Sequence, residues 1–369
     1  MNLSPYDKLP FYPGPVTVHP EIANVMYQDF APPRFGMEYT ELYIDLAKKI
    51  QKLCNTQNEV IFPTGEAMVG LWGAMKSCLK KGDHVVTVGT GVFGDGFADM
   101  AESIGCVVDK ISLPYNRTIT HEDMAVIDEA IKRAKPVMLT AVHCETPSGT
   151  LNPLEELGKL KKDRNVPLFV VDTVASMGGA KVDASAWNCD IVLGGSQKCF
   201  SCPPFMGILL VSDTAWEIAG KVKYLGYDSI LPFHKATENP MKFPYTPCYV
   251  GIQGLHKSLE LLEAEGFENV YRRHEEVAKA CRDGLKKIGI PLWTTKEAVN
   301  SPTCTAIMIP EGFTFKSWKQ ALAEHGMYIA GSFGPMDGKI FRIGHMGTQA
   351  NMEKIKEAIN VMETVLHSR

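Results

Sequence analysis

The sequence predicts an α/β protein with a mostly parallel sheet, and three observations carry that prediction. Helical and strand patterns alternate between about residues 40 and 215, as expected for a sheet covered by helices. Each of four apolar strands ends in a loop rich in Gly, Ser, Thr or Pro, and a fifth strand follows them. Ligands of open α/β sheets bind outside the carboxyl ends of the strands, so polar residues after these strands are the candidate site residues. The predicted strands are 84–88, 136–142, 167–172, 189–194 and 207–212.

The rest of the chain divides into an arm, an irregular segment and a second structural unit. Residues 1–15 are rich in proline, so we expect an extended arm rather than regular secondary structure. Residues 221–248 are irregular and also proline-rich, and loops of that length are usually functional or lie at an interface. Gly266 separates two helical patterns. We therefore expect the arm, a large domain over 16–265 and a smaller C-terminal α/β domain over 266–369. Helices in the small domain are predicted at 267–288 and 350–367.

Composition excludes several classes of function. The chain has 369 residues, 45% of them hydrophobic and 22% charged, as in an ordinary globular enzyme. Its net charge is −4 and it has no basic block, so nucleic-acid binding has no electrostatic support. No stretch reaches the roughly 18 apolar residues of a membrane span, and the N-terminus lacks the apolar run of a signal peptide. The ten scattered cysteines indicate reduced thiols and a cytoplasmic location. Cys199 and Cys202 form a C-x-x-C without a second pair, so we expect no metal site.

A lysine and an aspartate at the ends of two predicted strands carry the strongest chemical signal. Asp172 ends the strand at 167–172, and Lys198 follows the strand at 189–194 in the run Gly-Gly-Ser-Gln-Lys. Pyridoxal chemistry requires such a pair, because the lysine forms a Schiff base with the cofactor aldehyde and the aspartate keeps the pyridine nitrogen protonated. The structural alternatives are that Asp172 caps a helix and that Lys198 is a solvated lysine. The pair favours an enzyme.

A turn at a predicted helix N-terminus is a candidate anion site. Gly65, Glu66 and Ala67 open a helical run that ends at Cys78, and free backbone N–H groups at such a turn bind phosphate. Glu66 supports a second interpretation, because its carboxylate would satisfy those donors and repel a phosphate dianion.

Further positions could contact a bound ring or a substrate, and each has a structural alternative. Phe93 follows the strand at 84–88 and could stack on a planar ring or belong to the core. Thr146 and Ser148 follow the next strand, and their hydroxyls could bond a ring oxygen or form an ordinary turn. Arg342 alternates within an apolar run, so it could bind a substrate carboxylate or form an internal salt bridge.

Together these residues resemble the class V aminotransferases of fold type I, in the alanine–glyoxylate and serine–pyruvate branch. The resemblance implies a large domain with a mostly parallel sheet, a smaller C-terminal α/β domain and pyridoxal 5′-phosphate as cofactor. It also implies homodimers, or tetramers built from them, with active sites at the subunit interface. The matching segments cover nearly the whole chain and include 13–15, 64–65, 143–149, 171–179, 195–198 and 342–344.

The resemblance implies a role for each of the main candidates. Lys198 would be the Schiff-base lysine, and Asp172 would pair with the pyridine nitrogen. Phe93 would stack on the ring, and Arg342 would hold the substrate carboxylate.

Contacts to the cofactor phosphate are implied for Gln197 and, from the other subunit, for Thr246. Phe243 stands where many members have tyrosine, which weakens one such contact. The chain also resembles the pyridoxamine–pyruvate transaminases, whose substrate is the unphosphorylated vitamer. Glu66 is shared with them and favours a hydroxymethyl group over a phosphate. Phe333 stands where they have an arginine, in a run similar to that of ureidoglycine–glyoxylate and alanine–glyoxylate enzymes.

The expected function is ping-pong transfer of an amino group from a small donor to pyruvate or glyoxylate, with Lys198 as the general base. The donor stays open among alanine, serine, ureidoglycine, an aminophosphonate and pyridoxamine. With pyridoxamine, the free vitamers pyridoxal and pyridoxamine would be substrates rather than a bound cofactor. One rival is a cysteine-desulfurase-type lyase, which Gln197 disfavours because those enzymes usually place histidine before the lysine. The other is a non-catalytic binding protein of the same fold.

Overall fold

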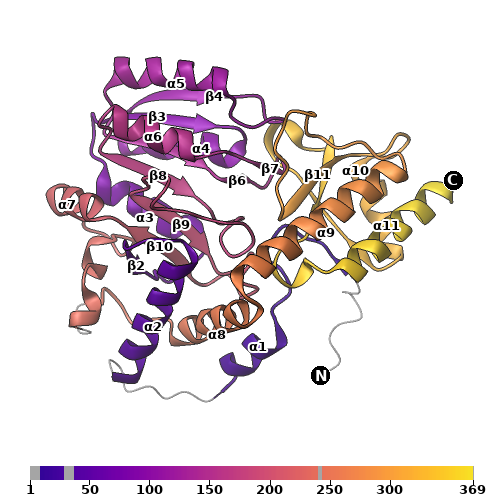
Figure 1. Ribbon diagram of the computed structural model, residues 1–369, viewed down its shortest axis with the longest axis horizontal. Helices are drawn as coiled ribbons and strands as arrows, with labels where there is room; N and C mark the ends of the chain where they lie inside the picture. The colour runs from indigo at the N-terminus through magenta and orange to yellow at the C-terminus, as the bar shows by residue number, and fades with distance from the viewer. Residues whose placement is uncertain (1–8, 29–36, 240–242, 369) are drawn as a thin grey trace.

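The computed structural model describes residues 9–28, 37–239 and 243–368, and its largest element is a seven-stranded sheet (Figure 1). Five adjacent strands, β9, β8, β5, β3 and β4, are parallel, and β10 runs antiparallel between β9 and β2. All five predicted strands are present, which confirms the mostly parallel sheet. The strands are β2 (Glu59–Ile61), β3 (His84–Gly89), β4 (Val107–Ser112), β5 (Met138–Val142), β8 (Leu168–Asp172), β9 (Ile191–Gly195) and β10 (Gly207–Val211).

The two edge strands of this sheet, β2 and β4, are absent from the sequence prediction. β2 has only three residues. β4 contains Asp109 and Lys110, and none of its residues is fully buried. An edge strand with a solvated face carries no continuous apolar run, so these two strands lack the signal that marks the central ones.

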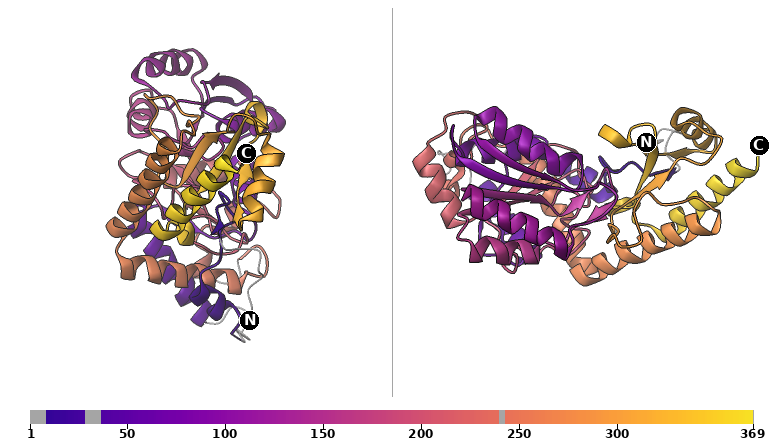
Figure 2. Two further views of the ribbon diagram at one scale, coloured as in Figure 1. Left: turned by 90° about the vertical axis from the view of Figure 1, so that its right-hand side faces the viewer. Right: turned by 90° about the horizontal axis from the view of Figure 1, so that it is seen from above.

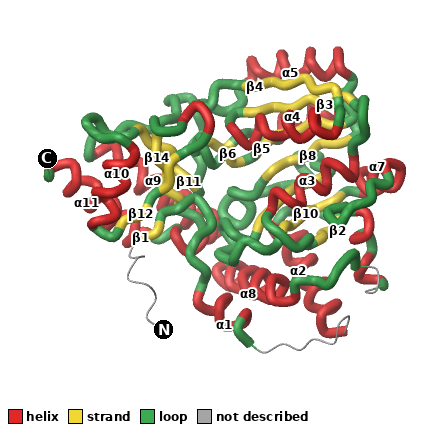
Figure 3. The backbone as a smooth tube through the Cα atoms, turned by 180° about the vertical axis from the view of Figure 1, so that it is seen from behind, coloured by secondary structure: helices red, strands yellow, loops and turns green. Residues whose placement is uncertain are grey.

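Helices pack against the sheet from the connections between its strands (Figure 3). α3 contacts β9 and β10, α4 contacts β3 and β4, and α6 contacts β8. Their starts follow ordinary capping chemistry. At α5, for example, the Thr120 hydroxyl accepts the Asp123 N–H while the Asp123 carboxylate accepts the Thr120 N–H. The helices of this part are α1 (Pro20–Met26), α2 (Met37–Leu53), α3 (Ala67–Cys78), α4 (Val92–Ile104), α5 (His121–Ala134), α6 (Glu155–Asp163), α7 (Asp213–Val222) and α8 (Tyr249–Glu265).

A second, smaller α/β unit lies beside the large sheet (Figure 2). Its antiparallel sheet has the order β11, β14, β13, and α9 and α11 pack against each other beside it. The predicted helices at 267–288 and 350–367 correspond to α9 and α11. The elements are α9 (Phe267–Lys287), β11 (Cys304–Met308), α10 (Phe315–Glu324), β12 (Met327–Tyr328), β13 (Ala330–Gly331), β14 (Ile340–Gly344) and α11 (Met352–His367).

The N-terminal arm differs from its prediction. Residues 1–8 lie outside the described part of the chain, but β1 (Leu9–Pro10) pairs in parallel with β12. A proline can take part because the flanking residues donate: the Leu9 and Phe11 N–H groups bond to the carbonyls of Gly326 and Tyr328. Leu9 and Phe11 are buried in the core of the small unit. The described arm is therefore a short strand fixed to that unit and not a free extension.

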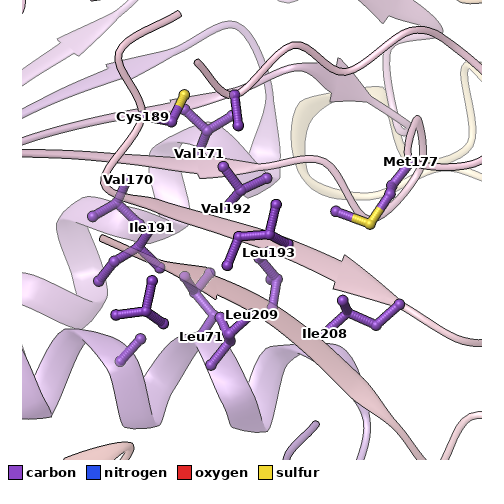
Figure 4. Packing of buried hydrophobic residues seen from close by; sticks show 14 of the residues in the cluster. Leu71, Val170, Val171, Met177, Cys189, Ile191, Val192, Leu193, Ile208 and Leu209 are labelled. Carbon is purple, nitrogen blue, oxygen red and sulfur yellow. The ribbon is translucent and has the colours of Figure 1, made fainter. Parts of the chain in front are cut away.

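Two large hydrophobic clusters form the core, and α9 contributes to both. The first lies around the large sheet, and Figure 4 shows its packing at Leu71 of α3, Leu193 of β9 and Leu209 of β10. α9 joins this cluster through Val270 and Tyr271 and joins the second through Val277, Cys281 and Leu285. The predicted domain division falls at the junction of α8 and α9 and stays a prediction. No helix in the described residues is long and apolar enough to cross a membrane.

Candidate active site

Four of the predicted site residues line one cavity at the carboxyl edge of the large sheet. The cavity has a volume of about 410 Å³, and its walls include Phe93, Thr146, Lys198 and Arg342. Phe93 follows β3, Thr146 follows β5 and Lys198 follows β9, whereas Arg342 lies on β14 of the small sheet. Both sheets therefore contribute to the cavity. Its other described lining residues are Tyr12, Pro13, Gly14, Pro15, Ala330 and Phe333.

The Lys198 amine is held by the N-terminal arm. Nζ donates a hydrogen bond to the carbonyl oxygen of Pro13 at 2.5 Å. Gly14 packs on the same side chain with φ +88°, and a Cβ there would come within 2.3 Å of Lys198 Cδ, so this position requires glycine. Burial lowers the pKa of Lys198, and the Arg342 guanidinium lowers it further. Because the neutral amine is the nucleophilic form, this environment favours a reactive lysine.

Asp172 ends β8 with a carboxyl group that is only 6% exposed. Burial raises its pKa to about 6, against the opposing effects of the Val174 N–H and the Lys198 amine. Oδ1 accepts the Val174 N–H at 2.8 Å, but a turn and not a helix follows, so Asp172 is not a helix cap. A carboxylate has about four acceptor positions, which leaves capacity for a protonated ring nitrogen.

Phe93 and Thr146 lie at the cavity, and Ser148 lies behind it. Phe93 lies in the first turn of α4, packs partly against the main core and also lines the cavity. Thr146 is buried and also lines the cavity. Ser148 is fully buried, and its hydroxyl donates to the carbonyl oxygen of Thr90 at 3.2 Å. That hydrogen bond holds together the two loops that follow β3 and β5.

The turn before α3 is already occupied by a carboxylate. Glu66 is the N-cap, and its Oε2 accepts the Met68 N–H at 2.8 Å. Its Oε1 accepts a hydrogen bond from Gln197 Nε2 at 2.5 Å, while the Gly65 N–H bonds to the carbonyl of Phe205. Ala67 is fully buried beside Gly195, where an added Cβ would lie 2.9 Å from the Ala67 Cβ.

These contacts decide how well pyridoxal 5′-phosphate fits the site. Lys198 suits the aldehyde, and Asp172 suits the ring nitrogen. Phe93 suits the ring face, and Thr146 suits a ring oxygen. At the other end, Glu66 places negative charge where a phosphate dianion would bind, which is unfavourable. A hydroxymethyl group could donate to this carboxylate instead. The residues present therefore fit the pyridine ring, and they fit an uncharged 5′ group better than a phosphate.

Arg342 is a buried cation without a protein counter-ion in the part of the chain that is described. Its side chain is on the central strand of the small sheet and is 4% exposed. Nε donates to the carbonyl oxygen of Gly331 at 2.7 Å, and the guanidinium carbon lies 4.8 Å from the centre of the Phe333 ring. Arg342 forms no ion pair with any described residue, so the alternative of an internal salt bridge is not observed. The fork of terminal N–H groups suits a substrate carboxylate.

Thr246 lies outside the cavity walls. It follows Tyr245, whose hydroxyl accepts the Thr64 N–H at 3.0 Å, and its own side chain is exposed in the single chain. This places the segment near the turn before α3. A contact of Thr246 with a cofactor in another subunit stays a prediction.

Three residues at the site had no assigned role in the sequence analysis: Pro13, Glu145 and Phe333. Glu145 is completely buried, and its two oxygens accept the Phe93 N–H at 3.1 Å and the Gly94 N–H at 2.9 Å. Burial raises its pKa to about 8. A carboxylate three residues after a buried strand was the available signal for Glu145. Pro13 acts through a backbone carbonyl, which no side-chain pattern reveals.

Comparison with known proteins agrees with this geometry. A family model described as aminotransferase class V matches residues 25–336. An uncharacterised aminotransferase of Methanocaldococcus jannaschii is 35% identical over 94% of this chain and 90% of its own length. The pyridoxamine–pyruvate transaminase of Mesorhizobium japonicum is 33% identical over 91% of this chain and 86% of its own. The crystal structure of an alanine–glyoxylate aminotransferase from Nostoc sp. superposes with a TM-score of 0.92 at 27% identity, covering 99% of this chain and 97% of that one. The chain therefore belongs to the class V aminotransferases and is an enzyme of the transaminase type, with the fold of the alanine–glyoxylate branch.

Proposed function

We propose that this enzyme transfers an amino group from a small amino donor to pyruvate or glyoxylate, with pyridoxal chemistry at Lys198. The observation that carries the proposal is the single cavity shared by the Lys198 amine and the unpaired Arg342 guanidinium. The amine suits condensation with the aldehyde of a pyridoxal ring and proton transfer at the substrate Cα, and the guanidinium suits the carboxylate bonded to that carbon. The similarity to a pyridoxamine–pyruvate transaminase and to an alanine–glyoxylate aminotransferase supports the substrate class.

Three residues of this chain would have separate roles in the reaction. A bound pyridoxal ring supplies an aldehyde carbon that condenses with amines and an electron-poor ring that stabilises negative charge on the substrate Cα. Asp172 holds a proton on the ring nitrogen. Arg342 fixes the substrate carboxylate, so that the Cα–H bond is presented to Lys198. Lys198 Nζ would then take the Cα proton as a general base and return a proton to the carbon that belonged to the ring aldehyde.

A second candidate function is the reaction of free pyridoxamine with pyruvate to give pyridoxal and alanine. Glu66 favours it, because this carboxylate accepts N–H groups from Met68 and Gln197 at the end of the site where a phosphate would bind. A phosphorylated ring would bring a dianion beside that carboxylate, whereas a free vitamer would bring a hydroxyl donor.

The first experiment compares the absorption spectrum of the purified protein with its activity toward pyridoxamine and pyruvate. Absorbance near ~410 nm that is bleached by alanine or serine would support a resident phosphorylated cofactor. A colourless protein that forms pyridoxal and alanine would support the vitamer as substrate. Absence of turnover with every donor named above would overturn both.

Replacement of Lys198 tests the proposed chemistry at one residue. We expect Lys198→Ala to retain its fold and to lose nearly all turnover, by a factor of about 10⁴ or more, because no other described lining side chain except Arg342 carries a basic nitrogen. Single-turnover kinetics and circular dichroism measure the two properties separately. Cys199→Ala, at the neighbouring buried thiol, is the matched control and should keep most of the activity. A Lys198→Ala enzyme with normal rates would disprove the assignment.

A further inference from the structure

Phe333 is exposed in a way that the fold does not require. The residues around it are fixed: the Ser332 hydroxyl donates to the carbonyl of Pro147 at 3.0 Å, and Met336 is fully buried. The Phe333 side chain itself remains 51% exposed. Its ring lies over the Arg342 guanidinium, 4.8 Å from the guanidinium carbon, and forms part of the cavity wall. An aromatic ring therefore lies on the cavity wall beside Arg342 and is not buried in the hydrophobic core.

The charge of the cavity wall restricts what can bind there. Among the ten described lining residues, Lys198 and Arg342 are the two cations, and none is a carboxylate. Lys198 is assigned to the chemistry, so Arg342 is left for a single substrate carboxylate. A second carboxylate would be buried without a counter-ion, and a cationic side chain would meet two positive groups; both situations are costly.

We infer that Phe333 is a specificity-determining residue that, together with Arg342, restricts this enzyme to monocarboxylic 2-oxo acids and amino acids with small uncharged side chains. The inference rests on the proposed function and names its substrate class. The ring holds the guanidinium plane by a cation–π contact, which pre-orients its free N–H groups for one carboxylate. The same ring forms the cavity wall beside the guanidinium, so it limits the size of a substrate side chain at that end.

Two substitutions separate these effects. Phe333→Leu keeps apolar bulk but removes the aromatic face, so KM for pyruvate or glyoxylate should rise by about tenfold while kcat changes little. Phe333→Ala also opens space, so the ratio of kcat/KM for 2-oxovalerate to that for pyruvate should rise by at least about tenfold. The unchanged enzyme should prefer pyruvate to oxaloacetate by about 100-fold or more, because oxaloacetate carries a second carboxylate. Tyr227→Leu is the matched control, since Tyr227 is 84% exposed and absent from the cavity wall.

A binding measurement keeps the test independent of turnover. Propionate and succinate are titrated into the purified protein and its Phe333→Leu variant by ligand-observed NMR. Propionate should bind the unchanged protein about tenfold more tightly than the variant, and succinate should bind neither. Melting temperatures within a few degrees of each other would show that both proteins are folded.

The outcomes distinguish this inference from the proposed function. Normal transamination with equal KM and equal 2-oxo acid selectivity in both variants would overturn the role of Phe333 and leave the proposed function intact. Absence of all turnover, with selective propionate binding that depends on Phe333, would overturn the proposed function and support only the role of Phe333 in carboxylate binding. Equal propionate binding in the unchanged and variant proteins would overturn the inference whatever the activity.

Discussion

Glu145 shows how a single residue without contact to solvent can influence the whole site. Its carboxyl group supports the first turn of α4 by accepting the Phe93 and Gly94 N–H groups. Gly91 packs so closely on it that an added Cβ would lie 2.2 Å from Glu145 Cγ. The ring that lines the cavity is therefore fixed by a buried acid. Burial raises the pKa of that acid from 4.5 to about 8.

The raised pKa predicts a pH-dependent stability that Glu145→Gln should remove. Below pH 4.5 the group is protonated in the folded and unfolded states alike. Between pH 4.5 and about 8 the unfolded chain ionises while the folded chain stays protonated, so the free energy of unfolding falls as the pH rises. Urea denaturation at pH 5, 6.5 and 8 should therefore show the unchanged protein losing stability relative to the variant.

The matched control for this pH series is Glu102→Gln, at an exposed position of α4. It should leave the pH dependence of the unchanged protein in place. The amide of Glu145→Gln faces two N–H donors and adds a pH-independent difference in the free energy of unfolding, so the prediction concerns only the part of the difference that changes with pH. Parallel stability curves for the unchanged protein and Glu145→Gln would contradict the prediction.

At the residue scale the sequence identified side chains but not their surroundings. Lys198, Phe93, Thr146 and Arg342 could be proposed because reactive or aromatic groups stand out after apolar strands, and the structure places all four at one cavity. Whether a side chain faces the cavity or the neighbouring loop depends on backbone direction after the strand. The two hydroxyls of the loop after β5 look equivalent in sequence, yet Ser148 bonds to Thr90 behind the cavity.

At the scale of elements, the connection between the two units depends on Arg273 of α9. Its Nε and Nη2 donate to the Glu265 carboxylate at 2.6 and 2.8 Å, and its Nη1 donates to the carbonyls of Gly347 and Ala350 at 3.2 and 3.1 Å. Gly347 in turn lies against the turn that holds Lys198, because a Cβ there would come within 3.2 Å of the Lys198 carbonyl oxygen. The helix junction is thus connected to the turn that holds Lys198.

Replacement of the Arg273 guanidinium should lower the free energy of unfolding measurably. Arg273→Lys keeps the charge but cannot reach the carboxylate and both carbonyls together. We expect the free energy of unfolding to fall by about 1–2 kcal/mol, a moderate value because the pair is about one-third exposed. Lys279→Gln breaks an exposed pair with Asp283 on the same helix and should cost about 0.5 kcal/mol or less. Equal effects of the two changes in urea denaturation would contradict a special role for Arg273.

The elements themselves were predictable wherever burial imposed a pattern. β5, β8 and β9 are buried at every position, so continuous apolar runs revealed them. β4 at the sheet edge has no such run, and β1 depends on β12, more than 300 residues further along the chain. Pairing over that distance leaves no local signal, since only two residues form the strand.

At the scale of the whole molecule, the surface around the start of α3 is exposed in the single chain. Glu66 at the start of α3 and Thr246 before α8 are both exposed. The first turns of the same helices also expose Val69 and Val250, by 47% and 38%. The Thr64 N–H and the Tyr245 hydroxyl join the two segments, so polar site residues and exposed apolar side chains occur on one connected region. Such a region is typical of a surface that a second subunit covers.

We therefore expect a homodimer whose interface includes the start of α3, and Val69→Glu should weaken it. A buried charge at a subunit interface is costly, so the variant should shift toward monomer in size-exclusion chromatography with light scattering. Its activity should rise with protein concentration, because each site would depend on the partner subunit. Val126→Glu changes an equally exposed valine of α5, 58% accessible and distant in sequence from the site, and should leave mass and activity unaltered. If the unchanged protein is a monomer with full activity, the expected interface does not exist. If Val69→Glu remains a dimer, the interface does not include the start of α3.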